Sequence, residues 1–92
     1  MSTKTIYSAE YRRLVQQLRD LREAAGISQS SLSAALGWPQ QRLSAIETGA
    51  RRLDVMEFLH LVGVLGLTPE AGIRLAVGAT TMESKAPRSK KP

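Results

Sequence analysis

Apolar side chains recur every three or four residues along most of this chain, which is the spacing of an amphipathic helix. Between residues 9 and 25 they form one face, with charged residues between them: Tyr11, Leu14, Val15, Leu18 and Leu21. Ser8 is suited to cap the beginning of such a helix, and Gly26 is suited to end it. The pattern therefore predicts a first helix over about residues 9–25.

Two shorter elements follow and meet at Trp38. Ser28 can cap a helix of about two turns that ends at Gly37. Pro39 can open the next helix, because the N–H that proline lacks has no partner in a first turn. Gly49 ends that helix, so the third helix is predicted from Pro39 to Thr48.

The segment from residue 54 to 77 is apolar on more than one face. Asp54 is a good N-cap for a buried helix that ends at Gly66. Thr68-Pro69 then suits a helix start, but Gly72 and the alternating residues 73–77 also suit a strand, which leaves residues 70–77 open between the two. With only four aromatic residues, the core must consist mainly of Leu, Ile, Val and Ala, which suits helices better than a sheet and predicts an all-α fold. The domain is predicted over residues 8–78 and a disordered basic tail over residues 79–92.

Composition and charge narrow the class of protein without identifying it. Ninety-two residues with 42% hydrophobic content suffice for one domain, and the absence of cysteine excludes disulfides and thiolate metal sites. The formal charge is +5, of which +3 lies in residues 80–92 and only +2 in residues 1–79. The first twenty residues carry several charges and no apolar run, so we expect no signal peptide, no membrane span and a cytoplasmic location.

The most specific pattern lies in residues 29–48. Two short helices that cross steeply need apolar residues at the fourth, eighth, tenth, fifteenth and eighteenth places, a small residue at the fifth and glycine at the ninth. All seven places are filled in order, by Leu32, Ser33, Leu36, Gly37, Trp38, Leu43 and Ile46. This pattern indicates a helix-turn-helix, whose second helix enters the major groove of DNA.

Over about residues 9–78 the chain resembles the lambda-repressor-like helix-turn-helix family, of the Cro/CI type or xenobiotic-response-element type. The resemblance is carried by Leu18-Arg19-Asp20-Leu21-Arg22, Gly26-Ile27-Ser28-Gln29, Leu36-Gly37, Ile46-Glu47-Thr48-Gly49 and Arg51-Arg52. It implies that the third of five helices reads DNA. It also implies a phosphate contact by Gln29, base contacts by Gln40, Gln41 and Ser44, and an ion pair between Arg22 and Glu47.

The chemistry of these side chains agrees with such roles. A glutamine amide both donates and accepts, so Gln40 and Gln41 can pair with the N6/N7 edge of adenine, which favours A·T pairs. Backbone N–H groups at the beginning of the second helix can bind a phosphate oxygen. Further phosphate contacts are expected from three basic residues, namely Arg42, Arg51 and Arg52.

Two aromatic rings are expected to pack rather than to bind a ligand. Trp38 stands where a smaller aliphatic residue is usual, and we expect it to cover the turn between the second and third helices. His60 is the only histidine and lies in an apolar stretch without the further ligands that a metal needs, so core or interface packing is expected. The sequence predicts no metal site and no cofactor.

Three functions fit these features. The first is a homodimeric repressor that binds an inverted repeat in double-stranded DNA. Its dimer surface would come from the apolar surplus of residues 54–77, namely Phe58, Leu61, Leu65, Ile73 and Leu75. The alternatives are an antitoxin that binds a cognate toxin and represses its own operon, and a protein-interaction adaptor that does not bind DNA. No nucleophile with a base, paired carboxylates or phosphate-binding glycine loop is present, so no enzymatic activity is expected.

Overall fold

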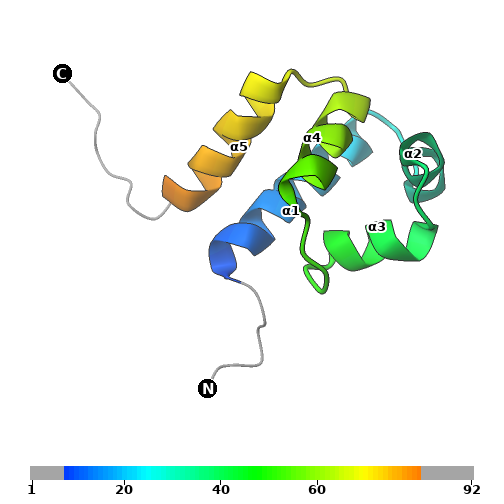
Figure 1. Ribbon diagram of the computed structural model, residues 1–92, viewed down its shortest axis with the longest axis horizontal. Coiled ribbons are helices and arrows are strands. Elements are labelled where there is room, and N and C mark those ends of the chain that lie inside the picture. The colour runs from blue at the N-terminus through cyan, green and yellow to red at the C-terminus, as the bar shows by residue number, and fades with distance from the viewer. Residues whose placement is uncertain (1–7, 82–92) are drawn as a thin grey trace.

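A computed structural model of the chain describes residues 8–81. Over that range the backbone forms five helices and no strand: α1 (Ala9–Ala24), α2 (Gln29–Leu36), α3 (Gln40–Glu47), α4 (Val55–Val64) and α5 (Pro69–Thr81). Helix α1 contacts α3 and α5, and α4 contacts α2 and α5, so that α2 and α3 lie at one end of the molecule and α5 at the other (Figure 1). The predicted all-α fold of five helices is confirmed.

Four of the five helices begin at the side-chain caps that the sequence predicted. Ser8, Ser28, Asp54 and Thr68 each accept a hydrogen bond from the backbone N–H three residues later, at 2.7–3.1 Å. Because the first N–H groups of a helix have no partner within the helix, these side chains fix where each helix starts. The exception is α3, whose N-cap residue, Pro39, makes no side-chain cap hydrogen bond.

The core is built from apolar residues of every helix, and the buried members are Val15, Leu18, Leu32, Leu36, Leu43, Ile46, Phe58, Leu61, Val62 and Ala79. Leu43 is fully buried and Ile46 is 1% exposed, which fixes the inner face of α3. Five of the seven residues that define the helix-turn-helix pattern are therefore buried, namely Leu32, Ser33, Leu36, Leu43 and Ile46. Their opposite side on α3 is left for solvent or a ligand.

Helix α5 takes the segment that the sequence left open between helix and strand. A Cβ atom added to Gly72 would lie 3.0–3.3 Å from three side-chain atoms of Val62 on α4. Because Gly72 has no side chain, α5 can approach α4 closely. This close approach explains why a glycine occurs within the helix. This contact joins two helices, so the local sequence pattern could not reveal it.

The domain also extends beyond the boundary predicted at residue 78. Helix α5 continues to Thr81, and Ala79 is 1% exposed. The Ala79 carbonyl accepts hydrogen bonds from Nε and Nη2 of Arg13 on α1, at 3.1 and 2.9 Å. Residues 79–81 therefore belong to α5 and not to the predicted tail. The local sequence could not show this, because the arginine that binds the Ala79 carbonyl lies on α1. The remaining tail, residues 82–92, lies outside the described residues.

Residues 8–81 contain neither a single membrane-spanning helix nor a cluster of metal-binding side chains. No single helix there is long and apolar enough to cross a membrane; α4 and α5 pass that test only as a pair, which is bent by 116°. Within the same residues no group of three or more His, Cys, Asp or Glu side chains is placed to hold a metal ion.

We expect Gly72→Ala to lower the free energy of unfolding by about 1 kcal/mol, because crowding against the buried Val62 outweighs the higher helix propensity of alanine. Gly63→Ala in α4 is the matched control, since a Cβ there has nothing within 4 Å beyond its own turn of helix. That control should raise the free energy of unfolding by about 0.5–1 kcal/mol. Urea denaturation measures both, and a stabilising Gly72→Ala would contradict the close approach of α4 and α5.

Candidate nucleic-acid interface

The turn between α2 and α3 depends on Gly37 and Pro39. Gly37 has φ 76° and ψ 26°, a left-handed conformation that glycine adopts without strain. The N–H of Trp38 then donates to the Ser33 carbonyl at 2.9 Å and closes α2. Pro39 is the N-cap of α3 with φ −61° and ψ 144°, and it supplies no side-chain cap. The third helix therefore begins at Gln40, one residue later than the predicted start.

Trp38 covers this turn, in agreement with the predicted packing role. Its ring is half-buried against the core, and the guanidinium carbon of Arg42 lies 5.1 Å from its centroid. His60 meets the ring edge-on, with centroids 6.4 Å apart and planes at 88°. His60 itself is exposed on α4, so of the two expected roles core packing is wrong and interface packing stays a prediction. The buried face of α4 consists of Phe58, Leu61 and Val62, and His60 lies off that face.

An ion pair within the core fixes α3 against α1. Arg22 Nε donates to Glu47 Oε2 at 2.7 Å and Arg22 Nη2 donates to Glu47 Oε1 at 3.0 Å, with the two residues only 6% and 7% exposed. Arg22 Nη1 also donates to the Ile27 carbonyl at 2.6 Å. The hydrogen bonding of Arg22 to the Glu47 carboxylate raises the pKa of Arg22, although burial of the guanidinium group acts to lower it. The ion pair that the resemblance implied is thus present, and it is bidentate.

Two glutamines connect this ion pair to the surface through hydrogen bonds. Gln29, the first residue of α2, donates from Nε2 to Glu47 Oε1 at 2.8 Å. Its own Oε1 accepts a longer hydrogen bond, 3.4 Å, from Nε2 of the exposed Gln40. The side chain of Gln40 is therefore oriented by a chain of contacts that begins at a buried carboxylate.

The outer side of α3 carries the other two residues predicted to touch bases. Gln41 is exposed and Ser44 is half-buried, while Leu43 and Ile46 point into the core. Residues 40, 41 and 44 share a face because positions three and four apart are neighbours on a helix. The structure thus brings the three predicted base-contacting side chains to one surface.

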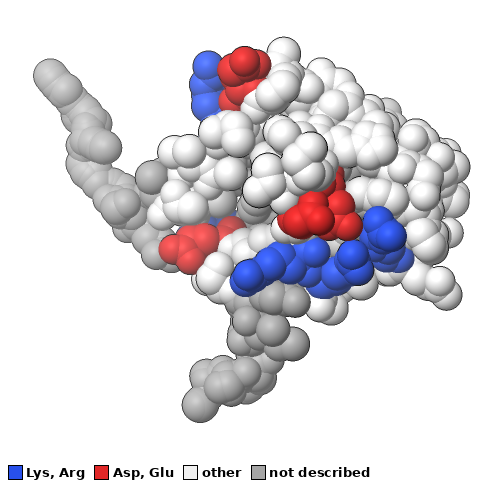
Figure 2. Space-filling view, in the orientation of Figure 1, with Lys and Arg blue, Asp and Glu red and all other residues white. Residues whose placement is uncertain are grey.

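The arginines predicted to contact phosphate lie beside this surface. Figure 2 shows basic side chains gathered along one edge of the molecule, with acidic side chains directly next to them. Arg42 Nη1 and Arg51 Nη2 lie 3.4 and 3.3 Å from the same atom, Glu57 Oε2. Arg52 is exposed in the loop that follows α3. Sequence reasoning missed Glu57, although its place three residues after Asp54 is typical of a capping box.

A tyrosine on α1 holds the loop that carries Arg51 and Arg52. The Tyr11 hydroxyl donates to the Arg51 carbonyl at 2.7 Å and accepts from the Leu53 N–H at 2.9 Å. The sequence pattern predicts only that Tyr11 belongs to the apolar face of the first helix. Nothing in the local sequence could have revealed this role, because the partners lie about forty residues away.

The five residues predicted to form a dimer surface separate into three groups by their exposure. Phe58 and Leu61 are 8% and 2% exposed and belong to the core of the protomer, so they offer little surface to a partner. Leu65 and Leu75 are half-buried against that core. Only Ile73 is largely exposed, at 51%. The sequence pattern missed three other exposed apolar side chains, those of Val55, Met56 and Val77.

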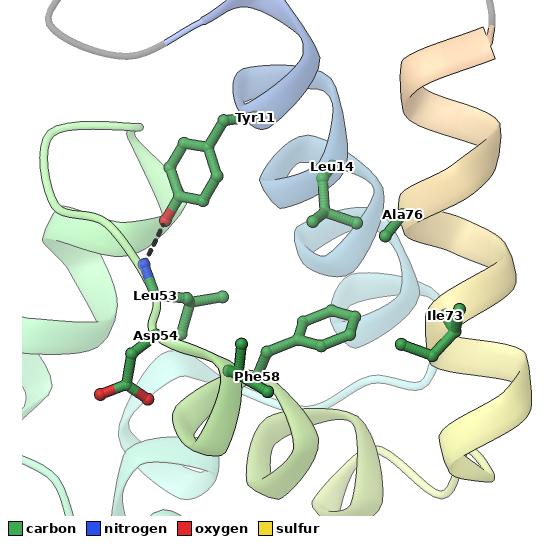
Figure 3. Close-up of a pocket in the computed structure, with 8 residues that line it drawn as sticks. Tyr11, Leu14, Leu53, Asp54, Phe58, Ile73 and Ala76 are labelled. Atoms are coloured by element: carbon green, nitrogen blue, oxygen red, sulfur yellow. Dashed lines mark hydrogen bonds between the residues drawn. The ribbon is translucent and has the colours of Figure 1, made fainter.

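A shallow apolar pocket of about 270 Å³ lies among α1, α4 and α5. Figure 3 shows Phe58 and Ile73 facing this space, with the Tyr11 hydroxyl bonded to the Leu53 N–H at its rim. Its lining is Tyr11, Leu14, Leu53, Asp54, Val55, Phe58, Ile73 and Ala76. The pocket thus joins the exposed apolar residues of α4 and α5 to the loop that follows α3.

We expect Arg22→Met and Glu47→Leu each to lower the free energy of unfolding by about 3–5 kcal/mol, because either change leaves an unpaired charge in the core. The double variant should recover most of that loss. Arg19→Met is the control, since it breaks the exposed Arg19–Glu23 pair and should cost less than about 1 kcal/mol. Denaturant unfolding measures all four variants, and single changes no larger than the control would contradict the role of the buried pair.

Comparisons with known proteins agree with this geometry. A family model described as a helix-turn-helix domain matches residues 13–75. Among solved structures, the chain is similar to an XRE-family like protein from Pseudomonas syringae pv. tomato str. DC3000, with 42% sequence identity and a TM-score of 0.72 over 86% of this chain and 96% of that chain. No curated protein matches the chain. The chain therefore belongs to the helix-turn-helix family and is a lambda-repressor-like DNA-binding protein.

Proposed function

We propose that this DNA-binding transcriptional regulator acts in the cytoplasm as a homodimeric repressor that reads an inverted repeat in double-stranded DNA. The observation that carries the proposal is the outer face of α3. Gln40 and Gln41 are exposed there, while Leu43 and Ile46 fix the opposite face in the core. A helix anchored in this way can enter the major groove without rearrangement.

Base contacts fall to residues 40, 41 and 44 in this proposal. The hydrogen bond between Gln29 and Gln40 uses the Gln29 amide oxygen and one N–H of Gln40. The other N–H and the amide oxygen of Gln40 remain for N7 and N6 of adenine. Gln41 is a second candidate for such a pair. Ser44 lies one turn further along α3 and can donate or accept at either kind of base pair.

Phosphate contacts flank this face. The Gln29 side chain is bonded to Glu47 and Gln40, so its proposed phosphate contact is made by the backbone N–H groups at the beginning of α2. Arg42, Arg51 and Arg52 add positive charge at the other edge. These contacts position the protein on the duplex, whereas the glutamines specify the sequence.

We expect DNA selected from a random library to contain A·T pairs opposite Gln40 or Gln41. Gln40→Ala and Gln41→Ala should each relax the preference at one position and weaken binding by about 1–3 kcal/mol. Arg52→Gln should weaken binding to all sequences and reduce the salt slope by about one. Gln16→Ala on α1, far from α3 in sequence, is the control and should leave the selected sequence unchanged. Unchanged selection by both α3 variants would favour the adaptor function instead.

The proposed dimer rests on the exposed apolar residues and the pocket between α4 and α5. One recognition helix buries little DNA surface, so a useful specificity generally needs two half-sites. Val55 and Ile73 line the pocket and are 69% and 51% exposed, and Val77 on α5 is 53% exposed, which is unusual for large apolar side chains. A second copy of the chain is the proposed partner for this surface.

We expect size-exclusion chromatography with light scattering to give a dimer for the wild type at micromolar concentration. Ile73→Asp should give a folded monomer that binds a single half-site weakly. Leu21→Asp is the control, because Leu21 is 37% exposed on α1 and is not part of the pocket. A wild-type monomer, or equal dissociation of the two variants, would contradict this interface.

A further inference from the structure

We infer that Glu57 limits the affinity of this protein for DNA by holding a fixed negative charge against two of its arginines. The inference rests on the proposed phosphate contacts of Arg42 and Arg51. It concerns a residue that plays no part in reading bases, since Glu57 lies on α4 and not on α3.

One carboxylate oxygen meets both arginines. Glu57 Oε2 lies 3.4 Å from Arg42 Nη1 and 3.3 Å from Arg51 Nη2. The Glu57 side chain is 17% exposed, and those of Arg42 and Arg51 are 33% and 44% exposed. The two guanidinium groups can therefore still reach a phosphate, but the carboxylate already neutralises part of their charge.

Glu57 cannot swing away when DNA arrives, because its other oxygen is held. Oε1 accepts a hydrogen bond from the Asp54 N–H at 2.9 Å, and the Glu57 N–H donates to Asp54 Oδ1 at 2.7 Å. This reciprocal pair caps the start of α4. Moving the side chain would break the Asp54 N–H half of this capping box, so we expect the charge to stay next to the arginines in the complex as well.

Glu57 could affect DNA binding in two opposite ways, by positioning the arginines for a phosphate or by repelling that phosphate. The contacts of 3.3 and 3.4 Å are long for charge-assisted hydrogen bonds and partly exposed, so they add little to the positioning of the arginines. A phosphate bound by the same guanidinium lies within about one Debye length of the carboxylate, which is about 10 Å at 0.1 M salt. Repulsion of phosphate therefore outweighs any gain from positioning.

The effect should be the same for every DNA sequence. Glu57 opposes phosphate groups, which carry no sequence information, and it contacts none of the proposed base-reading residues in the structure. Removing its charge should strengthen binding to random DNA as much as to the operator. Glu57 thus sets how tightly the protein binds DNA of any sequence, while the glutamines of α3 set which sequence it binds most tightly.

The test compares the wild type with Glu57→Gln on a fluorescent duplex of random sequence. Glutamine keeps an oxygen that can accept from the Asp54 N–H, so the cap survives while the charge is lost. We expect Glu57→Gln to bind about two- to fivefold more tightly at about 50 mM salt. The gain should shrink towards about 200 mM salt, because screening weakens the repulsion.

Two further variants make the result specific. Glu70→Gln removes one carboxylate from the first turn of α5, remote from α3 in Figure 1, and should leave DNA affinity unchanged. Glu57→Ala removes both the charge and the Glu57 half of the capping box. This variant should have a lower melting temperature. At a temperature where it is folded, it should still bind DNA more tightly than the wild type. Circular dichroism checks the helix content of each variant.

Weaker or equal binding by Glu57→Gln would overturn the inference, and so would an equal gain from Glu70→Gln. Arg42→Gln and Arg51→Gln separate this failure from that of the proposed function. If both arginine variants bind random DNA less tightly while Glu57→Gln does not bind it more tightly, only the inference fails. If neither arginine variant changes binding, the proposed phosphate contacts fail, and the inference fails with them.

Discussion

The arrangement of the helix-turn-helix depends on one charged pair that is almost completely removed from water. Removing two ions from water is costly unless their hydrogen-bonding groups are satisfied. Here the Glu47 carboxylate accepts from two nitrogens of Arg22 and from Gln29, and Arg22 also donates to the Ile27 carbonyl. These partners come from α1, the loop after it, the start of α2 and the end of α3. The pair is satisfied only when all four are in place, so it favours a single placement of α3.

A second carboxylate, that of Glu57, is proposed to oppose DNA binding at the same surface. Glu47 is buried and orients Gln40 through Gln29, whereas Glu57 sits at the surface and shares one oxygen between Arg42 and Arg51. Both carboxylates are immobilised, one by an ion pair and the other by a helix cap. On the proposed roles, specificity depends on the side chain that Glu47 orients, and overall affinity depends on Glu57, so the two properties rest on different carboxylates.

The sequence predicted most of the fold because the responsible interactions are local. Caps at Ser8, Ser28 and Asp54 act within one turn, and the spacing of Leu32, Leu36 and Leu43 reports a buried face directly. What it missed depends on contacts between distant elements. The helical state of residues 70–77 depends on room beside Val62, the end of α5 on Arg13, and the loop after α3 on Tyr11. Apolar spacing also could not divide α4 into core and surface, which is why Phe58 and Leu61 were expected at a dimer interface.

The exposed side of α4 lines the apolar pocket, and through this pocket partner binding could affect DNA binding. The apolar pocket is lined by Tyr11 and Leu53, and the hydrogen bond between these two residues holds the loop that carries Arg51 and Arg52. A side chain that enters the pocket from a second copy therefore contacts the residues that position two proposed phosphate-binding arginines. Ordering this loop before DNA arrives lowers the entropy that binding would otherwise cost. In the proposed dimer, each protomer would steady the arginine loop of the other, so the dimer would contribute more than a second half-site.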